Sequence, residues 1–194
     1  MMYFYVPLIR AWYLHLPKTG GMAIRRNGHL YVNKKQSNIP DDAYIFATLR
    51  DPIERFLSAY SMFKYGSDVR KPTRPDFTID EALEELDKYR DCTEATVANT
   101  SEFYYHAFPI THPFWRHDLV KHWLCYQNLE SEYKIFCANR GYRIPAIPRY
   151  NESNNKMAAS DLTCDQKTFL TDFYMDDLDL YMNYLLSKVP SQPK

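Results

Sequence analysis

Residues 11–24 read AWYLHLPKTGGMAI, and this stretch decides the fold class of the chain. Its first six residues are apolar or aromatic apart from one histidine, which is typical of a buried strand, and the residues after the two glycines favour a short helix that ends near Asn27-Gly28. The loop Pro17-Lys18-Thr19-Gly20-Gly21 lies between the two. A strand, a tight loop and a helix in this order form the basic unit of α/β proteins, in which parallel strands alternate with helices.

Two more strand-like segments, each followed by a helical pattern, extend this unit along the chain. They are YIFATL at residues 44–49 and HWLCY at residues 122–126. The chain start, MMYFYVPLIR, also favours a strand, because Pro7 and Arg10 interrupt it and it has neither the basic region nor the small-residue cleavage site of a signal sequence. We therefore predict a single α/β domain over residues 1–194, with a central parallel sheet flanked by helices in three layers.

Capping residues predict where the helices begin and end. Three helices are expected to start at an N-cap whose partner lies three residues later: Asp51 with Glu54, Thr78 with Glu81, and Thr163 with Gln166. A further helix should run from about Asn128 to Arg140 and end at Gly141. We expect the helix after Thr163 to be long and unbroken, with one buried stripe. That stripe consists of Phe169, Leu170, Phe173, Leu178, Tyr181 and Leu185.

Composition limits the kinds of partner. Hydrophobic residues make up 45% of the chain and charged residues 25%, which is ordinary for a soluble globular protein and excludes a disordered or fibrous chain. The 24 lysines and arginines equal the 24 aspartates and glutamates, so no overall basic field exists to hold a nucleic acid or an anionic membrane. We expect no nucleic-acid partner, and any anion site must be local.

The cysteines and the hydropathy pattern bear on the compartment. Cys92, Cys125, Cys137 and Cys164 show neither a CxxC pair nor a Cys/His ligand spacing, so no metal site is expected, and the four could form two disulfides or none. No apolar run approaches the roughly 18 residues needed to span a membrane. We therefore expect a soluble, cytoplasmic chain without a membrane anchor, with a trimmed Golgi-lumenal protein as the alternative.

The loop after the first parallel strand has the parts of a phosphate site. Backbone N–H groups are free where a strand turns into a helix, two glycines let the backbone approach a ligand, Lys18 adds a charge and Thr19 a hydroxyl. The alternative is a plain strand-to-helix turn with a surface lysine. The loop is not a Walker A motif, because GxxxxGK[ST] needs a glycine well before the lysine, and no Walker B aspartate is evident. This argues against an ordinary ATPase or kinase.

A second anion-binding segment is indicated by YIFATLRDPIERFLSAYSMF at residues 44–63. Arg50 lies at the end of a buried strand, the edge at which open α/β sheets bind ligands, and Ser58 lies on the following helix. An arginine fork with a nearby hydroxyl suits a second phosphate. Asp51 is explained by N-capping, whereas Arg55 is open between an i,i+4 pair with Asp51 and a ligand contact. The proline- and charge-rich residues 66–75 after this segment favour a linker.

Taken together, HLPKTGG at 15–21 and ATLRDPIERFLSAY at 47–60 resemble the two cofactor loops of sulfotransferases that use 3′-phosphoadenosine 5′-phosphosulfate (PAPS). The closest resemblance is to the carbohydrate sulfotransferase branch, which includes the Golgi heparan and chondroitin enzymes and smaller microbial and viral relatives. Further similarity lies in FTIDEALEEL at 77–86, CYQNLESE at 125–132, RYNES at 149–153 and DFYMDDLDLYMNY at 172–184. The chain departs from the family pattern at Gln127 and in the short segment between the first loop and His29.

This resemblance implies a P-loop-like version of the fold and assigns roles to residues. The 5′-phosphosulfate loop, residues 15–22, would bind through Lys18, Thr19, Gly20, Gly21 and Met22, the last by its backbone. In the 3′-phosphate loop, residues 47–60, Arg50 and Ser58 would bind the 3′-phosphate. A late nucleotide loop at about 148–156 would contribute Arg149, Asn151 and Ser153. No metal is implied.

The implied reaction moves a sulfuryl group from PAPS to a hydroxyl of an acceptor, a carbohydrate or another small molecule, and leaves adenosine 3′,5′-bisphosphate (PAP). Lys18 would stabilise the leaving phosphate. The acceptor proton needs a base, and histidine is suited to this near neutral pH. By the resemblance His29 is the first candidate, whereas His15 is expected to be structural. The second candidate is a histidine of the 106–122 segment, which holds His106, His112, His117 and His122.

The sequence leaves open two alternatives to a PAPS-dependent sulfotransferase. The chain could be a non-catalytic nucleotide- or glycan-binding module on the same fold, or an ATP-dependent phosphotransferase that requires Mg²⁺. The aromatic residues around His106 could form a wall for a sugar acceptor or could simply pack over the core. These residues are Tyr104, Tyr105, Phe108, Phe114 and Trp115.

Overall fold

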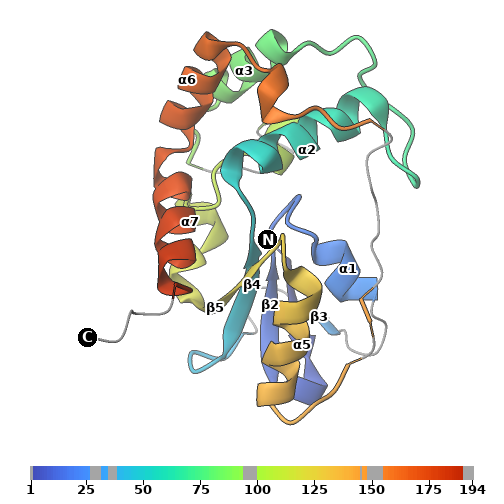
Figure 1. Ribbon diagram of the computed structural model, residues 1–194, viewed down its shortest axis with the longest axis vertical. Coiled ribbons are helices and arrows are strands. Elements are labelled where there is room, and N and C mark those ends of the chain that lie inside the picture. The colour runs from blue at the N-terminus through green and yellow to red at the C-terminus, as the bar shows by residue number, and fades with distance from the viewer. Residues whose placement is uncertain are drawn as a thin grey trace.

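The computed structural model describes residues 2–26, 32–34, 39–93, 100–144, 146–147 and 155–189. The described part of the chain contains one five-stranded sheet with the order β3-β1-β2-β4-β5 (Figure 1). Its strands are β1 (Met2–Val6), β2 (Ala11–His15), β3 (Val32–Lys34), β4 (Ile45–Leu49) and β5 (Val120–Cys125). All the strands expected from the sequence are therefore present.

The parallel part of the sheet is smaller than expected. Strands β2, β4 and β5 are parallel, as predicted, but β1 runs antiparallel to both β2 and β3. The reason is the connection: only the short helical turn η1 (Pro7–Ile9) and Arg10 join β1 to β2, whereas a parallel pair needs a crossover of a dozen or more residues. The carboxyl ends of β2, β4 and β5 lie at one edge, and each leads into a loop and a helix.

The helices begin and end close to the predicted caps. They are α1 (Gly21–Arg26), α2 (Pro52–Tyr65), α3 (Ile79–Lys88), α4 (Glu102–Ala107), α5 (Leu129–Asn139), α6 (Cys164–Phe173) and α7 (Met175–Ser187). The side chain of Asp51 accepts the Glu54 N–H at 2.9 Å, and capping boxes are present at Thr78 and Thr163. Gly141, with φ of 82°, follows α5 in the left-handed conformation that glycine favours.

The expected single C-terminal helix is wrong, because the structure has two helices that meet at Tyr174. This residue has φ of −105° and ψ of 22°, outside the helical range, and its side chain is fully buried. Its hydroxyl donates to the carbonyl of Ala107, which ties the junction to the end of α4. The break therefore serves tertiary contacts that the apolar pattern of residues 163–187 does not encode.

Helices cover both faces of the sheet and give the layered α/β architecture. Among the described residues, α1 and α5 form one core cluster with Tyr13 and Phe46, and α2, α3, α4, α6 and α7 belong to a second cluster that includes Trp12 and Leu14. Figure 1 shows α1 and α5 beside the strands and the larger group of helices beyond the carboxyl ends of the strands. No helix in the described ranges is long and apolar enough to cross a bilayer.

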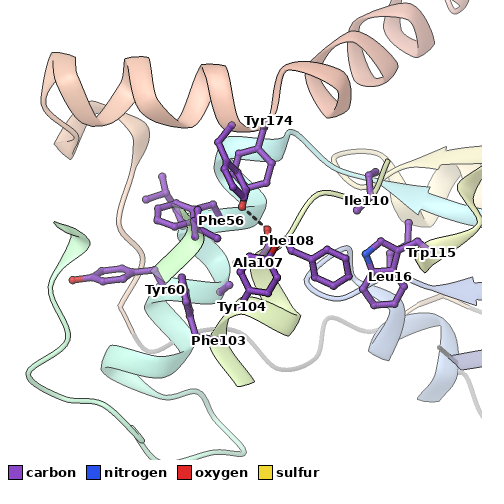
Figure 2. Close-up of a cluster of buried hydrophobic side chains, with 14 of the residues drawn as sticks. Leu16, Phe56, Tyr60, Phe103, Tyr104, Ala107, Phe108, Ile110, Trp115 and Tyr174 are labelled. Carbon is purple, nitrogen blue, oxygen red and sulfur yellow. Dashed lines mark hydrogen bonds between the residues drawn. The ribbon is translucent and has the colours of Figure 1, made fainter. Parts of the chain in front are cut away.

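The aromatic segment around α4 is core packing, not an open wall. Phe108 stacks on Trp115 with centroids 5.0 Å apart and on Tyr104 at 5.4 Å, and all three are fully buried (Figure 2). Tyr105 and Phe114 pack partly buried against the same cluster. Of the two interpretations left open by the sequence, packing over the core is the one observed. The four cysteines all lie in described ranges, and they form no disulfide with one another.

Candidate functional site

The loop that follows β2 has a strained backbone. Lys18 and Gly20 both adopt left-handed conformations, with φ of 63° and 81°. A left-handed residue with a side chain costs about 1–2 kcal/mol, so the Lys18 conformation persists only because its surroundings enforce it. Such outliers concentrate at functional sites, where they aim a group that an ordinary turn would place elsewhere.

The two glycines let this loop lie directly against its neighbours. A Cβ on Gly20 would meet Leu129 Cδ2 and Tyr126 Cδ2 at 2.9 Å each, and one on Gly21 would meet His15 Nδ1 at 2.2 Å and the Tyr13 hydroxyl at 2.6 Å. The loop is thus fixed between the end of β5 and the end of β2. No other residue type fits at Gly21 without a shift of β2 or the loop.

We expect Gly21→Ala to destabilise the fold by about 1–3 kcal/mol, because the added methyl overlaps two side chains of β2. Gly141→Ala is the matched control, since nothing lies within 4 Å of its Cβ and only the positive φ is strained. Urea denaturation of both variants measures the difference. An unchanged midpoint for Gly21→Ala would mean that the loop does not lie where the structure places it.

Lys18 extends its ammonium group along α2. Its Nζ lies 3.4 Å from Met62 Sδ, and it forms no ion pair with any carboxylate in the described part of the chain. Burial, together with the positive charges of Arg50 and Arg70, lowers the pKa of Lys18 to about 8. An ammonium group that has lost water, faces other cations and lacks an acid creates a local site for an anion.

Arg50 joins the second predicted segment to the loop. It directly follows β4, its Nη1 donates to the carbonyl of Lys18 at 3.1 Å, and its guanidinium lies 4.3 Å above the Tyr126 ring. Its Nε lies 3.7 Å from Glu54, and burial is the main cause that lowers its pKa. The structure therefore joins Arg50 to the backbone of Lys18, 32 positions away in the sequence, and the phosphate-binding roles of both residues stay predictions.

The other predicted residues of these loops have different environments. Thr19 is fully buried, and its hydroxyl donates to the carbonyl of Leu16 at 2.9 Å, so it stabilises the loop from within. Met22 is partly buried and its Sδ lies 3.5 Å from Arg25 Nη1. Ser58 lies partly buried on α2, and its hydroxyl makes no hydrogen bond with a described residue.

Neither interpretation of Arg55 is correct. Its guanidinium is buried, and it donates to the carbonyls of Ala107 at 3.0 Å and Phe108 at 2.9 Å and pairs with Asp177 at 3.4 Å. Asp51 instead caps α2. Arg55 lies on the side of α2 that faces the core, so its partner comes from α7 rather than from its own helix.

The histidines of the 106–122 segment do not form a cluster. His112 is bonded at both ring nitrogens, to the Cys92 carbonyl and the Phe114 N–H, and His122 stacks on Phe136 of α5. His106 instead lies against Phe63, with ring centroids 5.9 Å apart. His15 lies beneath Gly21, and burial lowers its pKa to about 4. Its buried Nδ1 has no hydrogen-bond partner in the described structure, so the hydrogen-bonded structural role expected for it stays a prediction.

One cation near the loop is not evident from the sequence. Arg70, in the turn after α2, lies 5.3 Å from the Phe63 ring centroid and is held by Glu102 at 2.9 and 3.1 Å. The linker predicted at residues 66–75 is instead a folded turn, because the positive φ of Gly66 and the bridge between Ser67 and Arg70 direct it back toward α2. A turn glycine followed by an arginine is too common a pattern to predict from the sequence that Arg70 lies near the loop.

Four predicted residues lie outside the described residues: His29, Arg149, Asn151 and Ser153. Their roles stay predictions. No cluster of three or more His, Cys, Asp or Glu side chains with metal-binding geometry occurs in the described ranges. Comparison with protein-family models, curated proteins and solved structures found no match to this chain.

Proposed function

We propose that this chain is a PAPS-dependent O-sulfotransferase with a P-loop-like fold that acts on a hydroxyl of a carbohydrate or another small molecule. The observation that carries the proposal is the joining of Lys18 and Arg50 at the carboxyl ends of β2 and β4. PAPS has phosphate groups at two positions, and it requires two cationic centres at such an edge. Lys18 is partly buried and has no carboxylate partner in the described ranges, which distinguishes this loop from an ordinary surface turn.

The donor set fits an anionic nucleotide. Lys18 and the backbone of residues 18–22 would hold the 5′-phosphosulfate, and Arg50 with Ser58 the 3′-phosphate. In the transfer, the bond between sulfur and the bridging oxygen breaks and negative charge grows on the leaving phosphate. Lys18, preorganised by its strained backbone and its contact with Met62, stabilises that charge. Arg50 fixes the loop by its bond to the Lys18 carbonyl as well as binding phosphate.

The acceptor is activated by a histidine that takes the hydroxyl proton. His29 is the candidate that the family resemblance favours, and the 106–122 segment supplies the other. The acceptor is a neutral or weakly charged molecule rather than a long polyanion, because positive and negative residues are equal in number.

A thermal-shift titration with PAP tests the proposal, with ATP and Mg²⁺ in parallel. A ligand that binds only the native state stabilises it by RT ln(1 + [L]/Kd), about 2.7 kcal/mol at 100-fold Kd, so PAP should raise the melting temperature and ATP should not. Arg50→Ala should abolish the shift. Arg116→Ala is the control, because Arg116 is exposed and its guanidinium pairs with Asp118.

Each other outcome contradicts part of the proposal. Stabilisation by ATP alone would make the loop a triphosphate site and favour the phosphotransferase. Stabilisation by PAP without any transfer from PAPS would leave a nucleotide-binding module. The absence of a shift with either nucleotide would rule out the loop as a nucleotide site.

A further inference from the structure

Three basic side chains from separate segments meet at one turn of α2. Lys18 Nζ lies 3.4 Å from Met62 Sδ, while the His106 ring and the Arg70 guanidinium lie 5.9 Å and 5.3 Å from the Phe63 ring centroid. Of these three groups, the proposed function gives a defined role only to Lys18. His106 is therefore close to the position where the sulfuryl group would be transferred, whereas His112 and His122 of the same segment are engaged elsewhere.

The His106 ring is not a satisfied core histidine. Its Nδ1 is buried without a hydrogen-bond partner, and the ring makes no hydrogen bond in the described part of the chain. Buried polar atoms are nearly always paired, and His15 and His117 also have an unpaired buried Nδ1. His106 differs from them because it lies against Phe63 with Lys18 and Arg70 nearby, where an anionic ligand and its acceptor would supply the missing partner. His112, six positions later, shows the ordinary arrangement, with both of its nitrogens bonded.

The backbone that carries His106 is held firmly. Arg55 Nη1 donates to the His106 carbonyl at 3.4 Å, and its Nη2 donates to the two carbonyls that come next in the chain. The hydroxyl of Tyr174 adds a second bond to one of these, that of Ala107. The end of α4 is thus fixed by α2 and by the junction of α6 and α7. A side chain on so constrained a backbone is preorganised, which catalytic groups require.

We propose that His106, rather than His29, accepts the proton of the acceptor hydroxyl, an inference that rests on the proposed sulfotransferase function. The hydroxyl proton passes to an imidazole nitrogen of His106 while the hydroxyl oxygen forms its bond to sulfur. The bond between sulfur and the bridging oxygen breaks, and its electron pair goes to the phosphate of PAP. The imidazolium then gives its proton to water.

The charges around His106 suit this role only when the donor is bound. The groups that face it in the described structure are Lys18, Arg70, His15 and Arg55. Burial first, and then the positive charges of Lys18, Arg70 and Arg55 together with the His15 imidazole, lower the pKa of His106 to about 3, which keeps its imidazole neutral and able to accept a proton. The phosphates of the nucleotide offset Lys18 and Arg70, so binding raises the basicity of His106 in the complex.

The test compares His106→Gln with wild type in two measurements on the full chain. The first is the affinity for PAP, which we expect to stay within about twofold because His106 is not a nucleotide ligand. The second is the single-turnover release of PAP from PAPS, with water as the acceptor that is always present and then with added methyl glucoside. We expect this rate to fall about 10²-fold. His112→Gln is the matched control and should retain the wild-type rate, and His29→Gln tests the competing candidate for the base.

The pH profile separates a base from a structural residue. The wild-type rate should rise with pH through the pKa of His106 in the complex, and this limb should be absent in His106→Gln. The proposal would be overturned if His106→Gln released PAP at the wild-type rate, or if His29→Gln lost this activity instead. It would also be overturned if the wild type bound PAP but released it from PAPS no faster than buffer alone does. A wild type that does not bind PAP would contradict the proposed function itself, which distinguishes the two failures.

Discussion

Replacing Asp177 with alanine is expected to lower the free energy of unfolding by about 3–5 kcal/mol, the range typical of breaking a buried ion pair. Asp177 is fully buried on α7 and pairs with Arg55 at 3.4 Å. It also accepts the N–H groups of Ile110 and Thr111, each at 2.9 Å, and the Thr111 hydroxyl at 2.7 Å. The substitution would leave a buried guanidinium without its counter-charge and two N–H groups without an acceptor.

Urea denaturation of three variants measures this loss of stability and separates the contribution of the charge from that of the hydrogen bonds. Asp176→Ala is the matched control, because Asp176 is the exposed neighbour on the same helix and should change stability by less than about 0.5 kcal/mol. Asp177→Asn retains one oxygen acceptor but removes the charge, so it should be intermediate. A loss below about 1 kcal/mol for Asp177→Ala would show that the pair does not secure the segment after α4.

Local signals in the sequence predicted the elements well. The cap at Asp51 and the boxes at Thr78 and Thr163 act within three residues, so the sequence encodes them directly. The meeting of Lys18 and Arg50 was also predictable, because parallel strands place their carboxyl ends at one edge. Features that depend on short-range capping or on strand direction can therefore be inferred without coordinates.

Interactions between distant segments could not be inferred in the same way. Arg55 lies four residues after Asp51, the spacing of a helix pair, yet it binds Asp177, 122 positions away, because it lies on the buried side of α2. The break at Tyr174 has the same origin, since it lets this tyrosine reach Ala107. Single-sequence periodicity describes one helix at a time and carries no information on which distant carbonyl a side chain must satisfy.

Arg50 and Arg55, five residues apart, illustrate this contrast between local signals and long-range contacts. Arg50 ends a strand and faces the loop, and Arg55 enters the helical core and holds the backbone that carries His106. The proposed site would therefore use both arginines, Arg50 beside the loop and Arg55 behind the backbone of His106. The segment is informative for the site because it contributes to the edge of the sheet and to the packing behind it.

Replacing Lys18 with glycine is expected to reduce sulfuryl transfer by about 10²–10³-fold while the fold becomes no less stable. The loss follows from removing the cation beside the leaving phosphate. The retained stability follows from two features of Lys18: glycine adopts its φ of 63° without strain, and an ammonium group that burial and nearby cations disfavour is removed. A transfer assay measures the expected loss of activity, and urea denaturation of the same preparation measures the retained stability.

Arg116→Gly is the matched control, since Arg116 also has a positive φ, 51°, but is exposed and far along the chain from the loop. It should gain from relief of strain and keep full transfer activity. A Lys18→Gly variant that transfers at the wild-type rate would end the proposed role of Lys18. One that melts far below wild type would show that Lys18 is structural.

The pH dependence of stability shows, without an activity assay, whether the Lys18 ammonium stabilises or destabilises the ligand-free fold. The pKa of Lys18 is about 8 in the folded protein and 10.5 ordinarily, so between these values the unfolded chain binds more protons than the folded one. Stability of the ligand-free wild type should therefore gain from Lys18 as pH rises from about 8 toward 10.5, and below about 8 the full penalty remains. Lys18→Gly lacks this contribution, so its stability advantage over wild type should shrink across that window. Bound PAP favours the protonated amine, and the same comparison with PAP present should lose the trend, because an anion would then offset the positive charge of Lys18.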